Sequence, residues 1–221
     1  MSKSNALAKK PQALKGEELK QEILRVALQH FAKKGFTKTN MDEIADEIGI
    51  HKPSIYYHLG KKEALFDAVI IAALEKHLHS LNTMLLQTAK PQQQLRAYIT
   101  AFADNLSGEN RYLANLLLRQ IATEDGYFPD AALQSMSEVR KILQQILAQG
   151  IEQQVFKPVN PFMIHMLIVG FFTTYAASGH MQEKMAAIPD ELDILQHAPS
   201  LHEAAEMVFT MLLDVLKPVN E

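Results

Sequence analysis

The sequence predicts an all-α fold of roughly nine helices, divided into a small N-terminal domain and a larger C-terminal one. From Glu17 onward, apolar residues recur at helical spacing, and no segment shows the alternation of a strand. Glycines and prolines interrupt this pattern at intervals typical of helix ends. The chain has 221 residues, of which 48% are hydrophobic, so a packed core is expected.

The N-terminal part is predicted to hold a basic arm and three short helices. Residues 1–16 form the arm, and residues 17–60 form the first domain. Its first helix carries an apolar face from Leu19 to Phe31 and ends at Gly35. The second covers residues 41–48, with Asn40 and Glu43 matching a capping box. The third covers residues 52–59, with Pro53 in its first turn.

The C-terminal part, residues 61–221, is predicted to be a helical domain. A long helix over residues 61–89 opens it, and Pro91 follows that helix. Later helices are expected at 92–107, 110–124, 130–154, 161–178 and 200–216. We expect the region from Met181 to Ser200 to be a loop with one short turn.

Composition limits the function classes. The chain has no cysteine, which excludes disulfides and thiolate metal sites. No secretory signal precedes Lys20, and the apolar run from Phe162 to Ala177 is interpreted as buried in protein rather than lipid, so a cytoplasmic protein without membrane contact is expected. His77 and His79 diverge on a helix, so neither a metal site nor a cofactor is predicted. His165 is interpreted as a core or interface histidine.

Charge is divided unevenly along the chain. Residues 1–66 carry 12 Lys or Arg and 8 Asp or Glu, a balance of +4. Residues 67–221 carry 10 and 17, a balance of −7. A basic first part joined to an acidic remainder indicates that only the first part meets an acidic partner.

The second and third predicted helices have the spacing of a helix-turn-helix. The turn is Gly49-Ile50-His51, where glycine permits a left-handed backbone. Apolar residues of these two helices can bury against the first predicted helix. This packing turns the polar and aromatic side chains of residues 52–58 outward. Such a short helix fits a major groove of double-stranded DNA.

At these residues the chain resembles the TetR family of transcriptional regulators. The resemblance runs without a gap over 48 residues, ILRVALQHFAKKGFTKTNMDEIADEIGIHKPSIYYHLGKKEALFDAVI. The sequence departs from the family pattern at His51, Leu59 and Lys61, and none of these changes removes the hydrophobic frame. The resemblance implies phosphate contacts from Tyr56, Tyr57, His58 and Lys62, with Lys61 a weaker candidate. It implies base-edge contacts from Lys52, Pro53 and Ser54, and backbone contacts from Thr37 and Thr39.

The resemblance also implies a homodimer that binds a palindromic operator and is released by a small-molecule effector, with repression as the family default. The helices 161–178 and 200–216 would pair across the two-fold axis. A pocket for a largely apolar effector would lie between helices in residues 92–178. Candidate lining residues are Tyr98, Phe102, Leu116, Arg119, Gln120, Met136, Met166 and Tyr175.

Alternatives remain at this stage. The arm lysines suit either a solvated tail or an arm that contacts DNA. Arg119 and Gln120 are either exposed or orient a ligand. The chain lacks a GxSxG elbow, a glycine-rich phosphate loop and an HExxH motif, which argues against an enzyme. An architectural DNA binder would not need the acidic helical domain, and an adaptor would not need the third helix.

Overall fold

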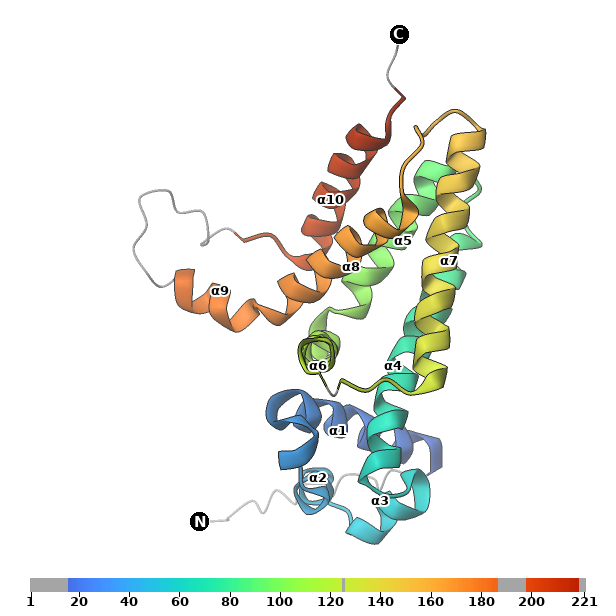
Figure 1. The fold of residues 1–221 in the computed structure, drawn as a ribbon. Coiled ribbons are helices and arrows are strands. Elements are labelled where there is room, and N and C mark those ends of the chain that lie inside the picture. Colours follow the sequence, from blue (N-terminus) through green and yellow to red (C-terminus); the bar gives the residue numbers. More distant parts are fainter. Residues whose placement is uncertain (1–15, 125, 187–197, 219–221) are drawn as a thin grey trace, which may run out of the picture.

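The computed structural model describes residues 16–124, 126–186 and 198–218, and every regular element in those ranges is a helix (Figure 1). The predicted all-α class is therefore confirmed. The helices are α1 Gly16–Lys38, α2 Met41–Ile48, α3 Lys52–Leu59, α4 Lys62–Leu85, α5 Pro91–Asn105, α6 Arg111–Ala122, α7 Asp130–Glu152, α8 Pro161–Ala177, α9 Gly179–Ala186 and α10 Leu201–Leu216, with a short 3-10 turn at Gly108–Asn110 before α6.

An aromatic cluster joins α1 to the first turns of α4 in the N-terminal domain. The ring of Phe31 meets that of Phe66 edge to face, with centroids 5.0 Å apart, and Phe36 lies 5.3 Å from Phe66. Gly35 makes this possible because its φ of 76° and ψ of 172° kink α1 and turn Phe36 back toward the core. That backbone region is almost exclusive to glycine. The α1 helix bends where the sequence predicted an end.

Helix α4 belongs to both parts of the molecule. Its first turns lie among the N-terminal helices, where Leu65 is fully buried and Phe66 nearly so. Its later turns run up into the C-terminal bundle, where Leu74 and Leu81 are buried (Figure 1). A rigid helix with a buried stripe in both domains can transmit displacement between them.

The C-terminal bundle is built from α4, α5, α7, α8 and α10, with α6 lying across its lower end. In Figure 1, α6 is seen end-on between the bundle and α1, and it packs against both α1 and α8. α10 packs along α5, and its start is fixed by a capping box in which the Ser200 and Glu203 side chains bond each other's backbone N–H. Buried leucine, isoleucine and phenylalanine side chains form one core that is continuous with the N-terminal domain.

Most helix boundaries fall within a few residues of those expected, with two differences. The helix predicted to reach residue 89 ends at Leu85, and residues 181–186, where a loop with one short turn was expected, belong to α9. The predicted arm over residues 1–16 lies, apart from Gly16, outside the described residues. So does the segment 187–197 of the predicted loop.

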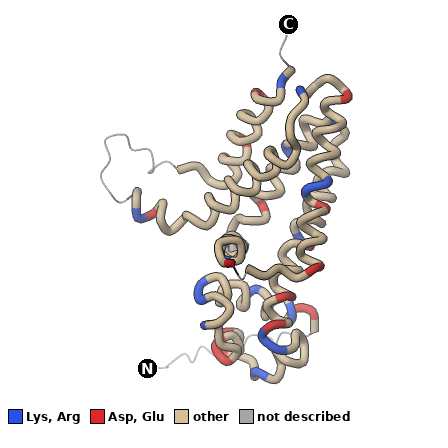
Figure 2. Tube along the Cα trace, in the orientation of Figure 1, with Lys and Arg blue, Asp and Glu red and all other residues tan. Residues whose placement is uncertain are grey.

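The surface carries charges of both signs. Figure 2 shows Lys and Arg interspersed with Asp and Glu over the N-terminal helices. In the part of the chain that the structure describes, no single helix is long and apolar enough to cross a membrane. One pair of helices, Pro161–Ala177 and Gly179–Met185, passes that test by length and composition together, but the pair is bent by 60°.

Candidate DNA interface and ligand cavity

The turn between α2 and α3 adopts the geometry expected of a helix-turn-helix. Gly49 has φ 77° and ψ 36°, a left-handed conformation, and its N–H lies 3.0 Å from the carbonyl oxygen of Ala45. The side chain of Asn40 accepts a hydrogen bond from the N–H of Asp42 at the start of α2. Ile44 and Ile55 are fully buried against the first domain's core. These contacts fix the angle at which α3 projects from the domain.

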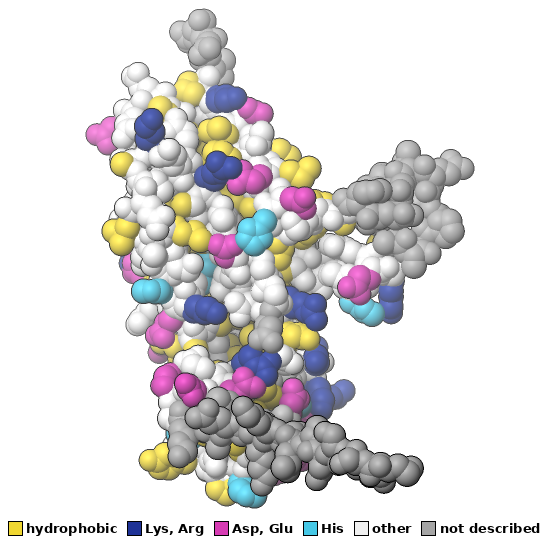
Figure 3. All heavy atoms as spheres, turned by 180° about the vertical axis from the view of Figure 1, so that it is seen from behind, with side chains coloured by type: hydrophobic (Ala, Val, Ile, Leu, Met, Phe, Trp, Pro, Cys, Tyr) yellow, Lys and Arg dark blue, Asp and Glu magenta, His cyan; other side chains and the backbone are white. Residues whose placement is uncertain are grey.

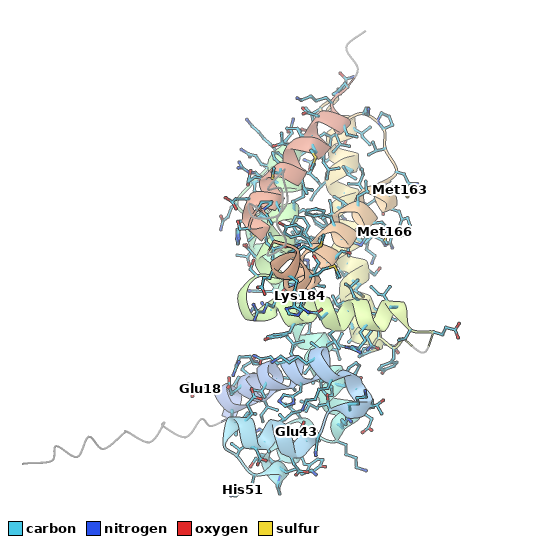
Figure 4. The ribbon with its side chains drawn as sticks, turned by 90° about the vertical axis from the view of Figure 1, so that its left-hand side faces the viewer. Glu18, Glu43, His51, Met163, Met166 and Lys184 are labelled. Atoms are coloured by element: carbon cyan, nitrogen blue, oxygen red, sulfur yellow. The ribbon has the colours of Figure 1, made fainter. Side chains whose placement is uncertain are left out.

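Helix α3 turns its polar and aromatic side chains to solvent at one end of the molecule. The exposed fractions of the Tyr57 and Tyr56 side chains are 86% and 42%. Pro53 is also exposed, while Ser54 and His58 are half-buried. His51, directly before α3, lies at the extreme tip (Figure 4). Figure 3 shows hydrophobic side chains at the same tip. Exposed tyrosines on a short projecting helix can contact both phosphates and bases.

Lys52 is the one lysine on α3, and it is paired with an acid of α2. Its Nζ lies 2.9 Å from Oδ2 of Asp42. The hydrogen bond to this carboxylate raises the pKa of Lys52. Because the pair is solvent-exposed, it contributes little to stability, and the ammonium can exchange Asp42 for a DNA acceptor.

The four remaining candidates near α4 occupy different environments. Thr37 and Lys61 are exposed. Thr39 is 3% exposed, and its hydroxyl donates to the carbonyl of Gly35 at 2.7 Å, so this side chain holds the kink rather than facing outward. Lys62 is half-buried and donates to the carbonyl of Thr37 at 3.1 Å. Lys61 stands at the N-cap of α4 without a side-chain capping bond, which leaves the positive helix end open to an anion.

A central cavity of about 90 Å³ lies inside the C-terminal bundle, between α4, α5, α6, α7 and α8. Two of the predicted lining residues, Phe102 and Met136, line it. Its full lining is Leu74, His77, Phe102, Asn105, Leu106, Leu117, Met136, Val139, His165, Val169 and Thr173.

Two further candidates, Tyr98 and Leu116, are fully buried beside this cavity without lining it. The Tyr98 hydroxyl lies 2.8 Å from Nδ1 of His165, which does line it. Burial raises the pKa of the Tyr98 phenol. Burial, helped by the charge of Arg140, lowers the pKa of His165. The prediction that His165 is satisfied within the core or an interface agrees with this hydrogen bond.

The other candidates lie away from the central cavity. The Tyr175 hydroxyl donates to the carbonyl of Pro199 at 2.6 Å, which ties α8 to the start of α10. Met166 is on the outer surface of α8. Arg119 and Gln120 line a separate, open cavity of about 630 Å³ between α6, α1 and α4. Nη2 of Arg119 is 3.5 Å from the carbonyl oxygen of Ala32, so Arg119 contacts the N-terminal domain.

Sequence reasoning missed His77 as a cavity residue. Its position offered a signal, since it falls between Leu74 and Leu81 on the apolar stripe of α4. Hydrophobic periodicity defines the stripe by its apolar residues alone, and the spacing of His77 and His79 bears only on metal binding.

An apolar surface covers the outer faces of α8 and α10. On α8 it consists of Phe162, Met163, Met166, Leu167 and Phe171, and on α10 of Met207, Met211 and Val215, all more than a third exposed. Figure 4 shows Met163 and Met166 at the outer edge of the bundle, pointing away from its core. We call these eight residues the apolar face. Contiguous methionine and phenylalanine side chains of this kind are typical of subunit interfaces.

Taken together, the fold and the projecting α3 helix define a helix-turn-helix DNA-binding protein with a helical C-terminal domain. Two family models match this chain. The model described as bacterial regulatory proteins, tetR family, matches residues 23–69, and the model described as Tetracyclin repressor-like, C-terminal domain, matches residues 91–215. The chain belongs to the TetR family of bacterial regulatory proteins.

Curated relatives are regulators of the same type. The uncharacterized HTH-type transcriptional regulator YerO of Bacillus subtilis is 30% identical over 148 residues, covering 62% of this chain and 50% of the relative. The HTH-type transcriptional repressor KstR2 of Mycobacterium tuberculosis is 27% identical over 144 residues, covering 62% and 68%. The match thus spans only about half the length of YerO.

Solved structures share the fold over nearly the whole chain. The ketosteroid transcriptional regulator KstR2 of Mycobacterium tuberculosis superposes with a TM-score of 0.69 at 18% identity, covering 93% of this chain and 98% of that one. The regulator FadR from Bacillus subtilis, in complex with stearoyl-CoA, gives a TM-score of 0.64 at 17% identity, covering 88% and 97%. At these identities the likeness extends to the fold alone.

Proposed function

We propose that this regulator is a repressor that binds a palindromic operator as a homodimer and leaves it when a small, largely apolar effector enters the central cavity. The observation that carries the proposal is the path of α4, which starts beside α3 and later lines the cavity with Leu74 and His77. An occupant of the cavity would therefore press on the helix that positions the DNA-reading element.

The homodimer is supported by the apolar face. Eight large hydrophobic side chains on two adjacent helices would be covered by the same face of a second copy, as two-fold symmetry requires. Ile168, in the middle of α8, is fully buried within its own chain and does not belong to this face. Contact between subunits would therefore run through its neighbours Met166 and Leu167.

The apolar nature of the effector is supported by the cavity lining, in which seven of eleven side chains are hydrophobic and none is charged at neutral pH. The descriptions of the structural neighbours name a ketosteroid regulator and a stearoyl-CoA complex, both involving molecules with large apolar parts.

Selection of genomic fragments on the purified protein tests the DNA part of the proposal. We expect a few fragments that carry inverted repeats, with half-sites spaced by about one or more helical turns of 10–10.5 base pairs. Random DNA should compete weakly. Retention of fragments without sequence preference would support an architectural DNA binder instead. Transcription from a selected promoter, measured with and without the protein, separates repression from activation.

A further inference from the structure

His77 is a buried polar side chain whose hydrogen-bonding capacity is not fully used. It is 3% exposed, and neither Nδ1 nor Nε2 has a hydrogen-bond partner of good geometry among the described residues. Its ring packs against that of Phe102, with centroids 4.5 Å apart. Buried polar groups in folded proteins are almost always hydrogen-bonded, so an unpartnered imidazole indicates that a group outside the chain completes it.

The ring of His77 lines the central cavity. Four polar side chains line it, namely His77, Asn105, His165 and Thr173. The two histidines differ, because Nδ1 of His165 is already engaged by the Tyr98 hydroxyl. His77 is therefore the histidine of the cavity that no side chain engages. The backbone carbonyl of Ala101 lies close to its ring, which leaves at least one ring nitrogen to meet a ligand.

The surroundings of His77 select a neutral ligand group. Burial lowers the pKa of His77 to about 4, an effect that the nearby Ala101 carbonyl opposes in part. At neutral pH the ring thus has one donor and one acceptor nitrogen. No lysine or arginine lines the cavity, so a carboxylate or phosphate there would have no cation in direct contact with it. A hydroxyl or carbonyl group meets no such penalty.

We propose that His77 is the recognition residue for the effector, and that its imidazole hydrogen-bonds the single hydroxyl or carbonyl group of a neutral, otherwise apolar molecule in the central cavity. This inference rests on the proposed function, because the molecule is the effector that releases the protein from its operator. An engineered apolar cavity of about 150 Å³ holds benzene, so the present 90 Å³ must widen to admit even a single ring. His77 and Leu74 both belong to α4, so we expect α4 to move when the cavity widens.

A matched pair of probes tests the proposal on the full chain. 4-Ethylphenol and ethylbenzene have the same apolar body and differ by one hydroxyl group. Isothermal titration should show the wild type binding 4-ethylphenol about 10-fold more tightly, the fold-change that one net hydrogen bond supplies. His77→Leu should bring the ratio close to one. The control His79→Leu changes an exposed histidine on the same helix and should keep the wild-type ratio.

Other outcomes overturn the proposal. It fails if His77→Leu retains the preference, or if the wild type binds neither probe or both equally. Should His77→Leu not fold, imidazole ¹⁵N resonances of the wild type decide the question. The His77 signals should shift with 4-ethylphenol and much less with ethylbenzene, and unshifted signals contradict the assignment. These readouts involve no DNA, so a wild type that fails to bind operator would refute the proposed function separately.

Discussion

Nζ of Lys62 lies 3.1 Å from the carbonyl oxygen of Thr37 and 4.8 Å from the ring centroid of Phe36. A lysine at the first position of a helix is electrostatically unfavourable, and these two contacts offset that cost. They also aim the ammonium across the junction between α1 and α4. Lys62 therefore stabilises the first domain in addition to its expected contact with a phosphate.

Lys62→Ala should weaken operator and random DNA binding by a similar factor, because a phosphate carries no sequence information. The slope of log K against log salt should fall by about 1 per subunit. The contacts with Thr37 and Phe36 add a loss of stability of about 0.5–1 kcal/mol. Titrations with both DNAs at several salt concentrations, with urea denaturation alongside, measure all three quantities. An altered operator preference with an unchanged salt slope would contradict the assignment.

Lys52→Ala and Ser54→Ala should each cost about 1–3 kcal/mol of binding on the operator and much less on random DNA, since both side chains sit in the first turn of α3 where base edges are reached. Neither side chain is buried, so the free protein should remain folded. The same DNA titrations measure the effect. Lys61→Ala serves as a control that should lower both affinities together. Equal losses on both DNAs for Lys52→Ala would assign Lys52 to phosphate instead.

Leu167→Lys should convert the dimer to monomer at micromolar concentration. Leu167 is 58% exposed, so the monomer should keep its fold, while the two-fold axis would bring two buried lysines together at a cost of several kcal/mol. Light scattering gives the mass, and circular dichroism checks the helix content. Leu133→Lys on α7, where the leucine is 49% exposed, is the matched control and should stay dimeric. A dimeric Leu167→Lys protein would place the interface elsewhere.

The depressed pKa of His77 predicts how stability depends on pH. The unfolded chain takes up this proton near pH 6.5 and the folded chain only near pH 4. The free energy of unfolding should therefore be highest above about pH 6.5 and fall as the pH drops toward 4. Between pH 7.5 and 5, His77 alone accounts for a loss of about 2 kcal/mol.

Urea denaturation of the wild type and of His77→Leu at both pH values isolates this effect. His165, whose pKa is also lowered by burial, is the other titratable group lining the cavity, and it is present in both proteins. The acids with lowered pKa values, such as Glu22 and Glu43, are likewise common to both. The variant should show a flatter dependence. Parallel curves would mean that His77 is protonated equally in the folded and unfolded states.

The sequence predicted the helix-turn-helix well because its signals are local. Gly49 and Pro53 act through backbone geometry within one turn, and the boundaries of α2 and α3 follow from them. The capping box at Ser200 and Glu203 is an equally local signal, although it did not form part of the prediction.

The cavity was less predictable because its lining depends on how five helices are rotated against each other. Consecutive residues of an α-helix point about 100° apart. Leu116 was predicted to line the cavity, whereas its neighbour Leu117 does so in the structure. Periodicity identified α8 as apolar nearly all round, and therefore could not distinguish the inward Ile168 from the outward Leu167.

The length of α4 between His77 and Lys62 also determines how far a small tilt of the helix moves its DNA-proximal end. His77 follows Lys62 by 15 residues, which at about 1.5 Å per residue corresponds to about 22 Å of helix. A tilt of about 5° around His77 would displace the start of the helix by about 2 Å, since the displacement is the product of arm length and angle. In a dimer the two displacements combine, so the distance between the two α3 helices would change by about 4 Å against a groove repeat of about 34 Å. A tilt of about 5° in α4 is thus enough to put the two reading helices out of step with the double helix.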